Sequence, residues 1–197
     1  MNNFTLKTYL TSNLDIDESE ILSIQKNCLI KEYAKDDFLL RNNERCQHIF
    51  FVEKGLLKQY MIDAKGKEHI LLFAPENWFV TDIESVYFNQ PSQYFIQALE
   101  PARVAFIDDD FIRKLEQKIP KFRDFNNLML HNQIRTLQRR VIMLMSQTAE
   151  ERYQQFIKTY PDILLRVPQT MVASYLGITP ESLSRVRREL VNKNFKN

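Results

Sequence analysis

The stretch QTMVASYLGITPESLSRVRR, residues 169–188, has the mix of apolar, small and polar residues that a DNA-binding helix-turn-helix needs. Val172, Ala173 and Leu176 would share one face of a first helix. Gly177 follows where the chain must turn sharply, and glycine tolerates the positive φ that such a turn requires. We therefore predict two helices that meet at Gly177.

The second predicted helix begins at Thr179, whose hydroxyl suits an N-cap, and Pro180 suits the first helical position, where no N–H donor is needed. Leu183, Val186 and Leu190 recur at helical spacing and should face inward. The opposite face could enter a major groove, where arginine pairs with guanine, glutamate accepts from cytosine and hydroxyls hold phosphate. The predicted DNA-contacting residues are Thr179, Glu181, Ser182, Ser184, Arg185 and Arg188.

Positive charge gathers around the same stretch. Six Lys or Arg against two Glu give residues 166–197 a net charge of +4, whereas the whole chain carries +2, so residues 1–165 carry −2. The alternative to a helix-turn-helix is a plain helical hairpin with a solvated basic face. The charge distribution favours DNA, because it lies where phosphates would be.

Length and composition limit the classes of protein to which this chain can belong. A chain of 197 residues can bury a sizeable core and hold a second, small domain. Its apolar fraction of 44% and charged fraction of 26% are ordinary for a soluble protein. No apolar run reaches the ~18 residues of a membrane span, and MNNFTLKTYL has no signal-peptide core. We expect a cytoplasmic protein without a membrane partner.

The cysteines and histidines do not predict a metal site or a cofactor. Cys28 and Cys46 are too few for a disulfide framework, a zinc site or a four-cysteine iron–sulfur cluster, and we expect reduced structural thiols. The three histidines form no HxxxH or HxH pair. Three aspartates at 108–110 could hold a cation, but helix capping is the favoured role.

Residues 29–108 contain short β-branched and aromatic runs separated by turn residues, which predicts at least seven strands of a jelly-roll-like β-roll. Turns are expected at Asn42 and Asn43, at Gly55, and over Asp63 to Lys67. Residues 5–10 and 18–28 have helical composition and could cover the roll. The predicted strands lie in CLIKEYA, FLLRN, HIFFVEKG, LLKQYMI, EHILLF, YFIQALE and ARVAFI.

Helices follow the roll, so the predicted class is α+β. DDDFIRKLEQKIP (108–120) should form a short helix, and residues 121–145, without glycine or proline, a helix about 37 Å long. Apolar residues on this helix alternate four and three apart, which favours a second copy as its cover; packing on its own chain is the alternative, because two heptads are few. The predicted dimer interface is Leu130, Ile134, Leu137, Val141 and Leu144.

A further helix should begin at a capping box made by Thr148 and Glu151 and end at Pro161. The predicted division of the chain is therefore a sensing β-roll with flanking helices over 1–120, a dimerisation helix over 121–146 and a helix-turn-helix domain over 147–197.

This order of elements resembles the cyclic-AMP receptor protein and fumarate–nitrate regulator (Crp/Fnr) superfamily of bacterial transcription regulators. The likeness is carried by EKG at 53–55, PENWF and DIES within 75–85, Pro120, and ITPESLSRVRREL at 178–190. The resemblance implies base contacts by Glu181 and Arg185 and phosphate contacts by Thr179 and Arg188. Pro180 stands where members carry a basic residue, and the ending NKNFKN shows no evident C-terminal wing.

The resemblance is weaker at the effector pocket. Cyclic-nucleotide binders of the superfamily hold the ribose with Gly-Glu-Leu and the phosphate with Arg-Ser, where this chain has residues 81–83, Thr-Asp-Ile, and then Ser92 and Gln93. Without the arginine, burying the phosphate would cost several kcal/mol, so we expect no tight binding of cyclic AMP. An uncharged or aromatic effector and a roll filled by its own side chains remain alternatives. The candidate pocket residues are Trp78, Phe79, Asp82, Ser92, Gln93, Tyr94, Leu137 and Gln138.

The sequence thus predicts a homodimeric transcription regulator that recognises a palindromic operator in double-stranded DNA. RNA polymerase and an unidentified small molecule are further candidate partners. An enzyme finds little support, because no nucleophile elbow, P-loop, GxGxxG or HExxH occurs. A second alternative is an adaptor that acts through protein contacts and carries a degenerate helix-turn-helix.

Overall fold

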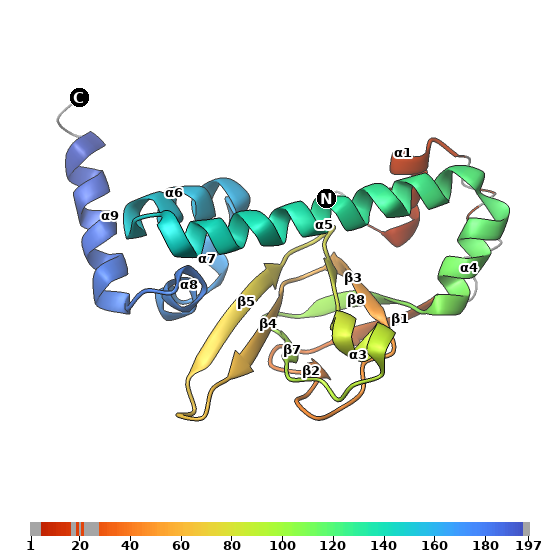
Figure 1. The fold of residues 1–197 in the computed structure, drawn as a ribbon, viewed down its shortest axis with the longest axis horizontal. Coiled ribbons are helices and arrows are strands. Elements are labelled where there is room, and N and C mark those ends of the chain that lie inside the picture. The colour runs from red at the N-terminus through yellow and green to blue at the C-terminus, as the bar shows by residue number, and fades with distance from the viewer. Residues whose placement is uncertain (1–4, 17–18, 20, 22–27, 195–197) are drawn as a thin grey trace. The chain divides into compact units, whose positions relative to one another are not determined.

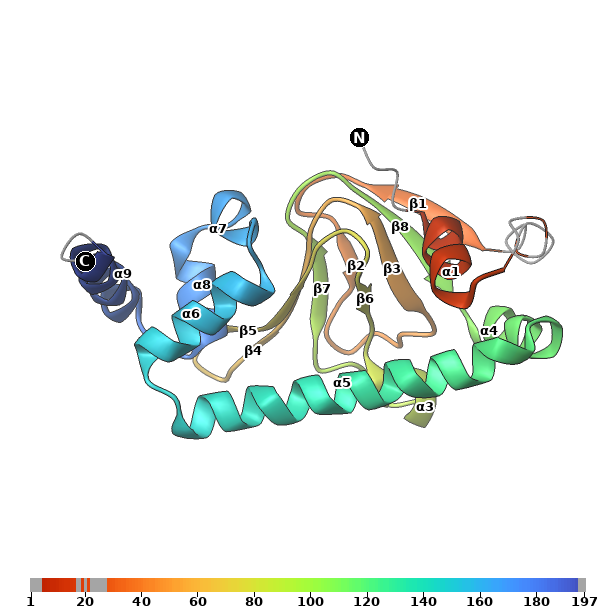
Figure 2. The same cartoon turned by 90° about the horizontal axis from the view of Figure 1, so that it is seen from above.

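A computed structural model describes residues 5–16, 19, 21 and 28–194, so the helix predicted over 18–28 lies mostly outside the described residues. The chain forms two compact units (Figures 1 and 2). The first comprises residues 1–62 and 71–130, and the second residues 63–70 and 131–197. The second unit therefore combines the end of the chain with a short segment from the middle of the roll.

The predicted α+β class with a β-roll is confirmed. The strands form two four-stranded antiparallel sheets, in the orders β1-β8-β3-β6 and β2-β7-β4-β5. Among the strands of the described residues, only β6 has no counterpart in the prediction, because two residues give no periodic signal. The strands are β1 (Leu29–Tyr33), β2 (Phe38–Leu40), β3 (Ile49–Lys54), β4 (Leu57–Ile62), β5 (Glu68–Ala74), β6 (Phe79–Val80), β7 (Phe95–Ala98) and β8 (Ala102–Ile107).

The turn between β3 and β4 requires glycine. Gly55 has φ +92°, and a Cβ there would lie 2.6 Å from the carbonyl oxygen of Pro101. Its N–H donates to the Glu76 carboxylate at 2.9 Å. A larger residue would therefore meet both an unfavourable φ and the neighbouring backbone.

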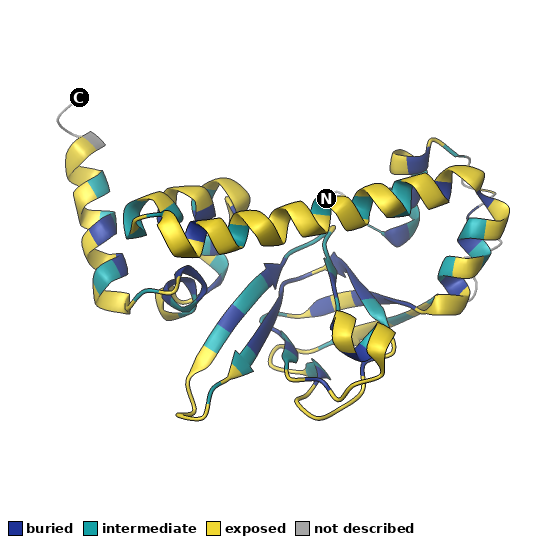
Figure 3. Ribbon diagram, in the orientation of Figure 1, coloured by how far each residue is buried: buried dark blue, intermediate teal, exposed yellow. Residues whose placement is uncertain are grey.

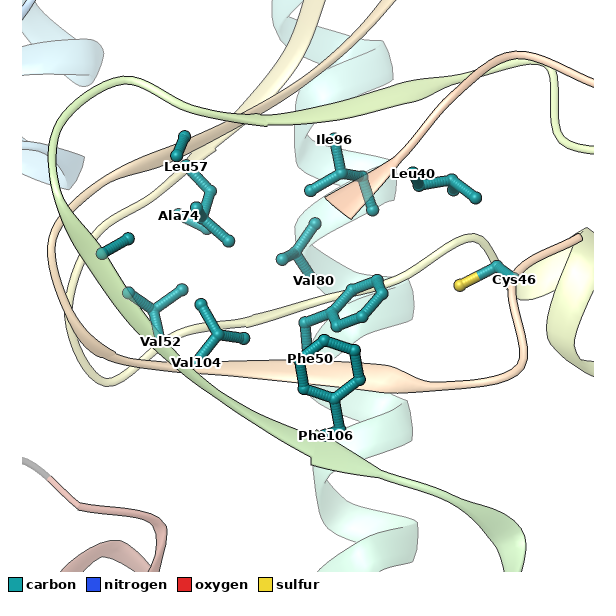
Figure 4. Close-up of a cluster of buried hydrophobic side chains, with 12 residues drawn as sticks. Leu40, Cys46, Phe50, Val52, Leu57, Ala74, Val80, Ile96, Val104 and Phe106 are labelled. Carbon is teal, nitrogen blue, oxygen red and sulfur yellow. The ribbon is translucent and has the colours of Figure 1, made fainter. Parts of the chain in front are cut away.

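Two hydrophobic cores form on the two faces of the β1-β8-β3-β6 sheet. Phe50, Val104 and Phe106 point into the roll, where side chains such as Leu57 and Ile96 of the other sheet face them (Figure 4). Alternate residues on the same strands, such as Phe51 and Ala105, face outward. The outer core also contains residues of α1 (Leu6–Leu14), α4 (Asp109–Lys118) and the start of α5 (Pro120–Ser146): Leu6, Leu10, Leu14, Phe111, Leu115 and Phe122.

The exit helix begins where it was predicted, whereas the long helix begins one residue earlier than predicted. Asp108 caps α4 by accepting the Phe111 N–H at 2.7 Å, which gives one of the three aspartates a capping role. Pro120 occupies the first position of α5 rather than the end of α4, and it loses no hydrogen bond there. Within the roll, a short helix, α3 (Ile83–Phe88), follows β6. Figure 3 shows that α5 is exposed along most of its length.

The second unit contains α6 (Ala149–Thr159), α7 (Ile163–Arg166), α8 (Gln169–Leu176) and α9 (Pro180–Asn194), together with the end of α5. The capping box of Thr148 and Glu151 is confirmed. Three aromatic rings, Phe156, Tyr160 and Tyr175, lie within 5.2–5.6 Å of one another and form part of its core. Residues 63–70 of this unit are the tip of the β4–β5 hairpin.

Candidate nucleic-acid interface

The turn between α8 and α9 has the predicted geometry. Gly177 adopts φ +68° in the left-handed region, directly after α8 ends at Leu176. The N–H groups of Gly177 and Ile178 donate back to the carbonyls of Ser174 and Ala173, both at 3.1 Å. These bonds satisfy the last carbonyls of α8 and fix the direction in which α9 leaves.

Thr179 caps α9. Its Oγ1 accepts the Ser182 N–H at 3.2 Å, and the two hydroxyls lie 3.3 Å apart. The hydroxyls of Thr179 and Ser182, both predicted to contact DNA, are thus already engaged in the helix cap. Hydrogen bonds from its own backbone N–H and from the Thr179 side chain lower the pKa of Glu181, so this carboxylate stays ionised at the start of the helix.

Helix α9 has a buried face and an exposed face. Leu183 and Val186 are buried, and Leu190 is half-buried. Four of the predicted DNA-contacting residues lie on the exposed face, three of them in the first two turns of α9 and one in the third turn. The exposed residues are Glu181, Ser184, Arg185 and Arg188.

Two arginines that the sequence did not single out hold the C-terminal end of α8. Arg140 of α5 stacks on the Tyr175 ring, with its guanidinium carbon 3.6 Å from the centroid, and donates to the Tyr175 carbonyl. Arg152 of α6 donates to the carbonyls of Leu176 at 3.1 Å and Leu144 at 2.9 Å. Burial lowers the pKa of Arg140. Both cations therefore stabilise the negative, C-terminal end of a helix.

An ion pair ties the far end of α9 to α6. Lys193 Nζ lies 2.8 Å from both carboxylate oxygens of Glu150, and this bond raises the pKa of Lys193. The pair joins the last turn of α9 to the first turn of α6. The basic residue at the end of α9 is thus used within the protein, whereas Arg185 and Arg188 are directed outward.

The predicted dimer residues are exposed on α5. Leu130, Ile134, Leu137, Val141 and Leu144 are between 40% and 56% exposed, although all are large and apolar. Ile142 and Met145 beside them are 59% and 81% exposed, and the sequence pattern did not include these two residues. Such a row of apolar side chains on one helix is typical of an interaction surface.

Three of the candidate effector residues, Asp82, Ser92 and Tyr94, lie near one another. Asp82 is the N-cap of α3 and accepts the N–H groups of Glu84 and Ser85 at 3.0 and 3.2 Å. The Ser92 hydroxyl is engaged in a local turn with the backbone of Tyr94. Burial and the charges of Asp82 and Glu84 raise the pKa of Tyr94.

The aromatic candidates face different cores. Trp78 packs against the core inside the roll, whereas Phe79 lies in the outer core, 4.8 Å from the Phe51 ring. Leu137 and Gln138 are exposed on α5. Gln93 lines a cavity of about 420 Å³, together with Asn42, Met61, Ile62 and Phe95.

The thiols have the chemistry of structural cysteines. Burial, with the charges of Glu53 and Asp108, raises the pKa of Cys28 to about 11, and burial also raises the pKa of Cys46. Both stay protonated at neutral pH and are therefore weak nucleophiles and weak metal ligands. The described residues contain no cluster of three potential metal ligands. Among the described helices, none is long and apolar enough to span a bilayer.

Comparisons with known proteins agree with this arrangement. Residues 30–118, from β1 to α4, match the cyclic nucleotide-binding domain family. The chain is 28% and 29% identical over 167 residues to the anaerobic regulatory proteins of Aggregatibacter actinomycetemcomitans and Haemophilus influenzae, and the match covers 79% of this chain. It spans 64% of the length of those relatives.

The fold also matches a solved structure. FixK2 from Bradyrhizobium japonicum superposes with a TM-score of 0.71 at 18% identity, covering 85% of this chain and 86% of that one. The matched region extends beyond the cyclic nucleotide-binding domain, so the roll and most of the helices that follow it share one fold with FixK2.

Proposed function

Because the chain belongs to the Crp/Fnr superfamily, we propose that it is a DNA-binding transcription regulator. The observation that carries this proposal is the exposed face of α9, which presents Glu181, Arg185 and Arg188 on a helix with a buried inner face. An arginine can donate two hydrogen bonds to guanine, and a glutamate can accept one from cytosine. The matched relatives are named as regulators, and we propose no catalytic activity.

The test is selection of random DNA duplexes by the purified protein, followed by affinity measurements at two salt concentrations. We expect enrichment of a palindrome with half-sites about ten base pairs apart. Salt-sensitive binding without sequence preference would leave two explanations, an absent effector or a wrong assignment. Repeating the selection with cell extract separates them, because only an effector-dependent regulator gains sequence preference.

We propose a homodimer in which α5 packs against α5 of a second copy. Association would remove the exposed apolar row from water, and two recognition helices about 34 Å apart would enter successive major grooves. Ile134→Glu should yield a monomer in light scattering, because the new charge would lie inside the interface. Thr136→Glu, also exposed but outside the row, is the matched control and should remain dimeric.

We propose that the roll does not bind cyclic AMP tightly. None of the residues that line the 420 Å³ cavity carries a cationic side chain, so a cyclic phosphate would lose hydration without gaining a partner. Amides at Asn42 and Gln93 and the Phe95 ring suit an uncharged or aromatic effector better; a cavity without any effector is the alternative. A dissociation constant for cyclic AMP of micromolar or tighter in calorimetry would contradict this.

The cellular setting follows from the same proposal. A bacterial regulator of this kind would act in the cytoplasm, with RNA polymerase as a candidate partner. An adaptor with a degenerate helix-turn-helix is not favoured, because the turn at Gly177, the cap at Thr179 and the buried Leu183 and Val186 give the motif all its structural parts.

A further inference from the structure

A second cavity lies where β1 and β3 end and β8 begins. Its volume is about 340 Å³, near the lower end of the roughly 300–1,000 Å³ typical of small-molecule sites. The cavity lies entirely within the first unit. Its lining residues are Thr5, Glu32, Tyr33, Glu53, Lys54, Pro101, Ala102 and Arg103.

A β-bulge gathers charged side chains on the outer face of the β1-β8-β3-β6 sheet. Lys54 of β3 pairs with Arg103 of β8, and the register shifts just before this pair, so Glu53 is an extra residue in its strand. Arg103 points outward because its neighbour Val104 points into the roll (Figure 4). On the other side of β8, Arg103 pairs with Glu32 of β1. Glu32, Arg103 and Lys54 thus form a row of alternating charge, with about 5 Å between neighbouring Cβ atoms.

Glu53 places a buried carboxylate in the wall of this cavity. Only 5% of the residue is exposed. Its Oε1 accepts the Leu6 N–H, at the start of α1, at 3.0 Å. Its Oε2 lies 3.0 Å from Arg103 Nε, yet this oxygen accepts no hydrogen bond from a described residue. The ion pair therefore balances the charge of Glu53 but leaves one buried oxygen without a hydrogen bond, which is unfavourable.

The other charged groups of the cavity are open to a ligand. The Arg103 side chain is 48% exposed, and Glu53 is the only described residue with which it forms an ion pair. Lys54 and Glu32 are exposed, and their side chains form no ion pair or hydrogen bond within the described part of the chain. The cavity therefore presents two carboxylates and two cations, and most of their hydrogen-bonding capacity is unused.

These charges favour a zwitterionic ligand. Two carboxylates would repel an anion, and two cationic side chains would repel a metal ion or an organic cation. A ligand with one ammonium and one carboxylate group suits both pairs. In an α-amino acid the two groups are attached to the same carbon, a spacing that matches charged side chains on neighbouring strands. The charge pattern and the small volume together point to a free amino acid.

We propose that this cavity binds a free α-amino acid with an uncharged side chain. Glu32 and Glu53 accept from the ammonium group, which takes the place of the Arg103 guanidinium at the Glu53 oxygen that lacks a hydrogen bond. Arg103 turns to the ligand carboxylate and binds it through two parallel N–H groups, with Lys54 beside it. The ligand side chain rests against Tyr33. Because every residue of the site lies in the first unit, the site does not rest on the proposed DNA-binding function.

Calorimetry of the whole chain with the standard L-amino acids, one at a time, tests the site. We expect at least one amino acid with an uncharged side chain to bind with a dissociation constant in the micromolar to millimolar range. Its carboxamide lacks the carboxylate, and its N-acetyl derivative lacks the ammonium group. Each derivative should bind about tenfold more weakly, because it loses a charged hydrogen bond. The proposal is overturned if no amino acid binds, or if either derivative binds as tightly as its parent.

Variants at Lys54 and Glu32 locate the site, since neither exposed side chain contributes a bond to the described fold. Lys54→Gln should weaken binding of the amino acid about two- to fivefold, as for an exposed ion pair, yet leave binding of the carboxamide unchanged. Glu32→Gln should weaken binding of the amino acid similarly and leave the N-acetyl derivative unchanged. Lys158→Gln, also exposed but in the second unit, is the matched control. Equal affinities for the amino acid in the natural protein and in both cavity variants would overturn the proposal.

Discussion

The helix-turn-helix and the cavity of the roll contrast in how their residues are assembled. The turn between α8 and α9 and the N-cap of α9 join residues within five positions of each other, such as Thr179 with Ser182 and Ala173 with Ile178. The cavity gathers residues from three separate parts of the chain, at 42, 61–62 and 93–95. The first kind of site is fixed by local chemistry, whereas the second depends on how distant strands pack.

The contrast also explains why aligned residues can change roles. The resemblance to cyclic-nucleotide binders implies ligand contacts at Asp82 and Ser92, yet here these residues bond the backbone of α3 and of a turn. Aspartate and serine are among the best residues for caps and turns. An alignment therefore identifies the position, and only the packing decides whether the side chain is available to a ligand.

The largest effect should come from removing the arginine that binds several carbonyls of the second unit. Arg152→Met should lower the free energy of unfolding of that unit by about 3 kcal/mol, because charged hydrogen bonds are worth about 1.5–3 kcal/mol each. Circular dichroism would follow the helices, and fluorescence of Trp78, the single tryptophan, would follow the roll. Arg139→Met, exposed on α5, is the control. A matching shift of the Trp78 transition would show that the two units unfold together. That result would contradict the contrast between the helix-turn-helix and the roll.

Next in size is the loss of base contacts. Arg185→Ala should reduce discrimination between the selected duplex and a scrambled one by about 1–3 kcal/mol, measured as a ratio of affinities, while circular dichroism stays unchanged. Arg113→Ala, on the exposed side of α4, should leave the ratio unaltered. Equal affinity ratios for the natural protein and for Arg185→Ala would show that Arg185 makes no base-specific contact.

A smaller effect is expected in the roll. Asp82→Ala should cost about 1 kcal/mol of the roll's stability, since α3 loses its N-cap, whereas Asp82→Asn should cost much less because asparagine also caps. Denaturation followed by Trp78 fluorescence measures both. If neither variant changes stability, the Asp82 carboxylate is not serving as a cap. The carboxylate would then again be a candidate for contacting a ligand.

The smallest effect concerns pH. The hydrogen bond to His69, aided by two backbone N–H groups, lowers the pKa of Asp63 to about 2. A lowered pKa stabilises the folded state above the unfolded value of about 3.9, and this contribution is lost as pH falls toward 2. NMR titration of the Asp63 carboxyl carbon should give that low midpoint, and His69→Ala should raise it toward the ordinary value. A midpoint near 4 in the natural protein would mean that Asp63 does not hold these hydrogen bonds in solution.

The sequence alone predicted the features that depend on residues close together in the chain. The glycine at 177, the cap at 179 and the alternating strands all follow from patterns a few residues long. It did not predict that Arg152 would bind a carbonyl 24 residues away or that Ser174 would bind one 106 residues away. Arginine and serine suit many exposed positions, so nothing in the local pattern marks such partners.

The tip of the β4–β5 hairpin, residues 63–70, belongs to the second unit, and its hydrogen bonds to Ser174 of α8 bear on how this protein can evolve. Loop tips normally accept insertions and deletions readily. Here a single residue added between Glu68 and Ile70 would move one of the two groups that Ser174 binds onto the opposite edge of the strand. The length of this loop should therefore be inherited together with α8, and exchanging the C-terminal helices for those of a relative would require exchanging the hairpin as well.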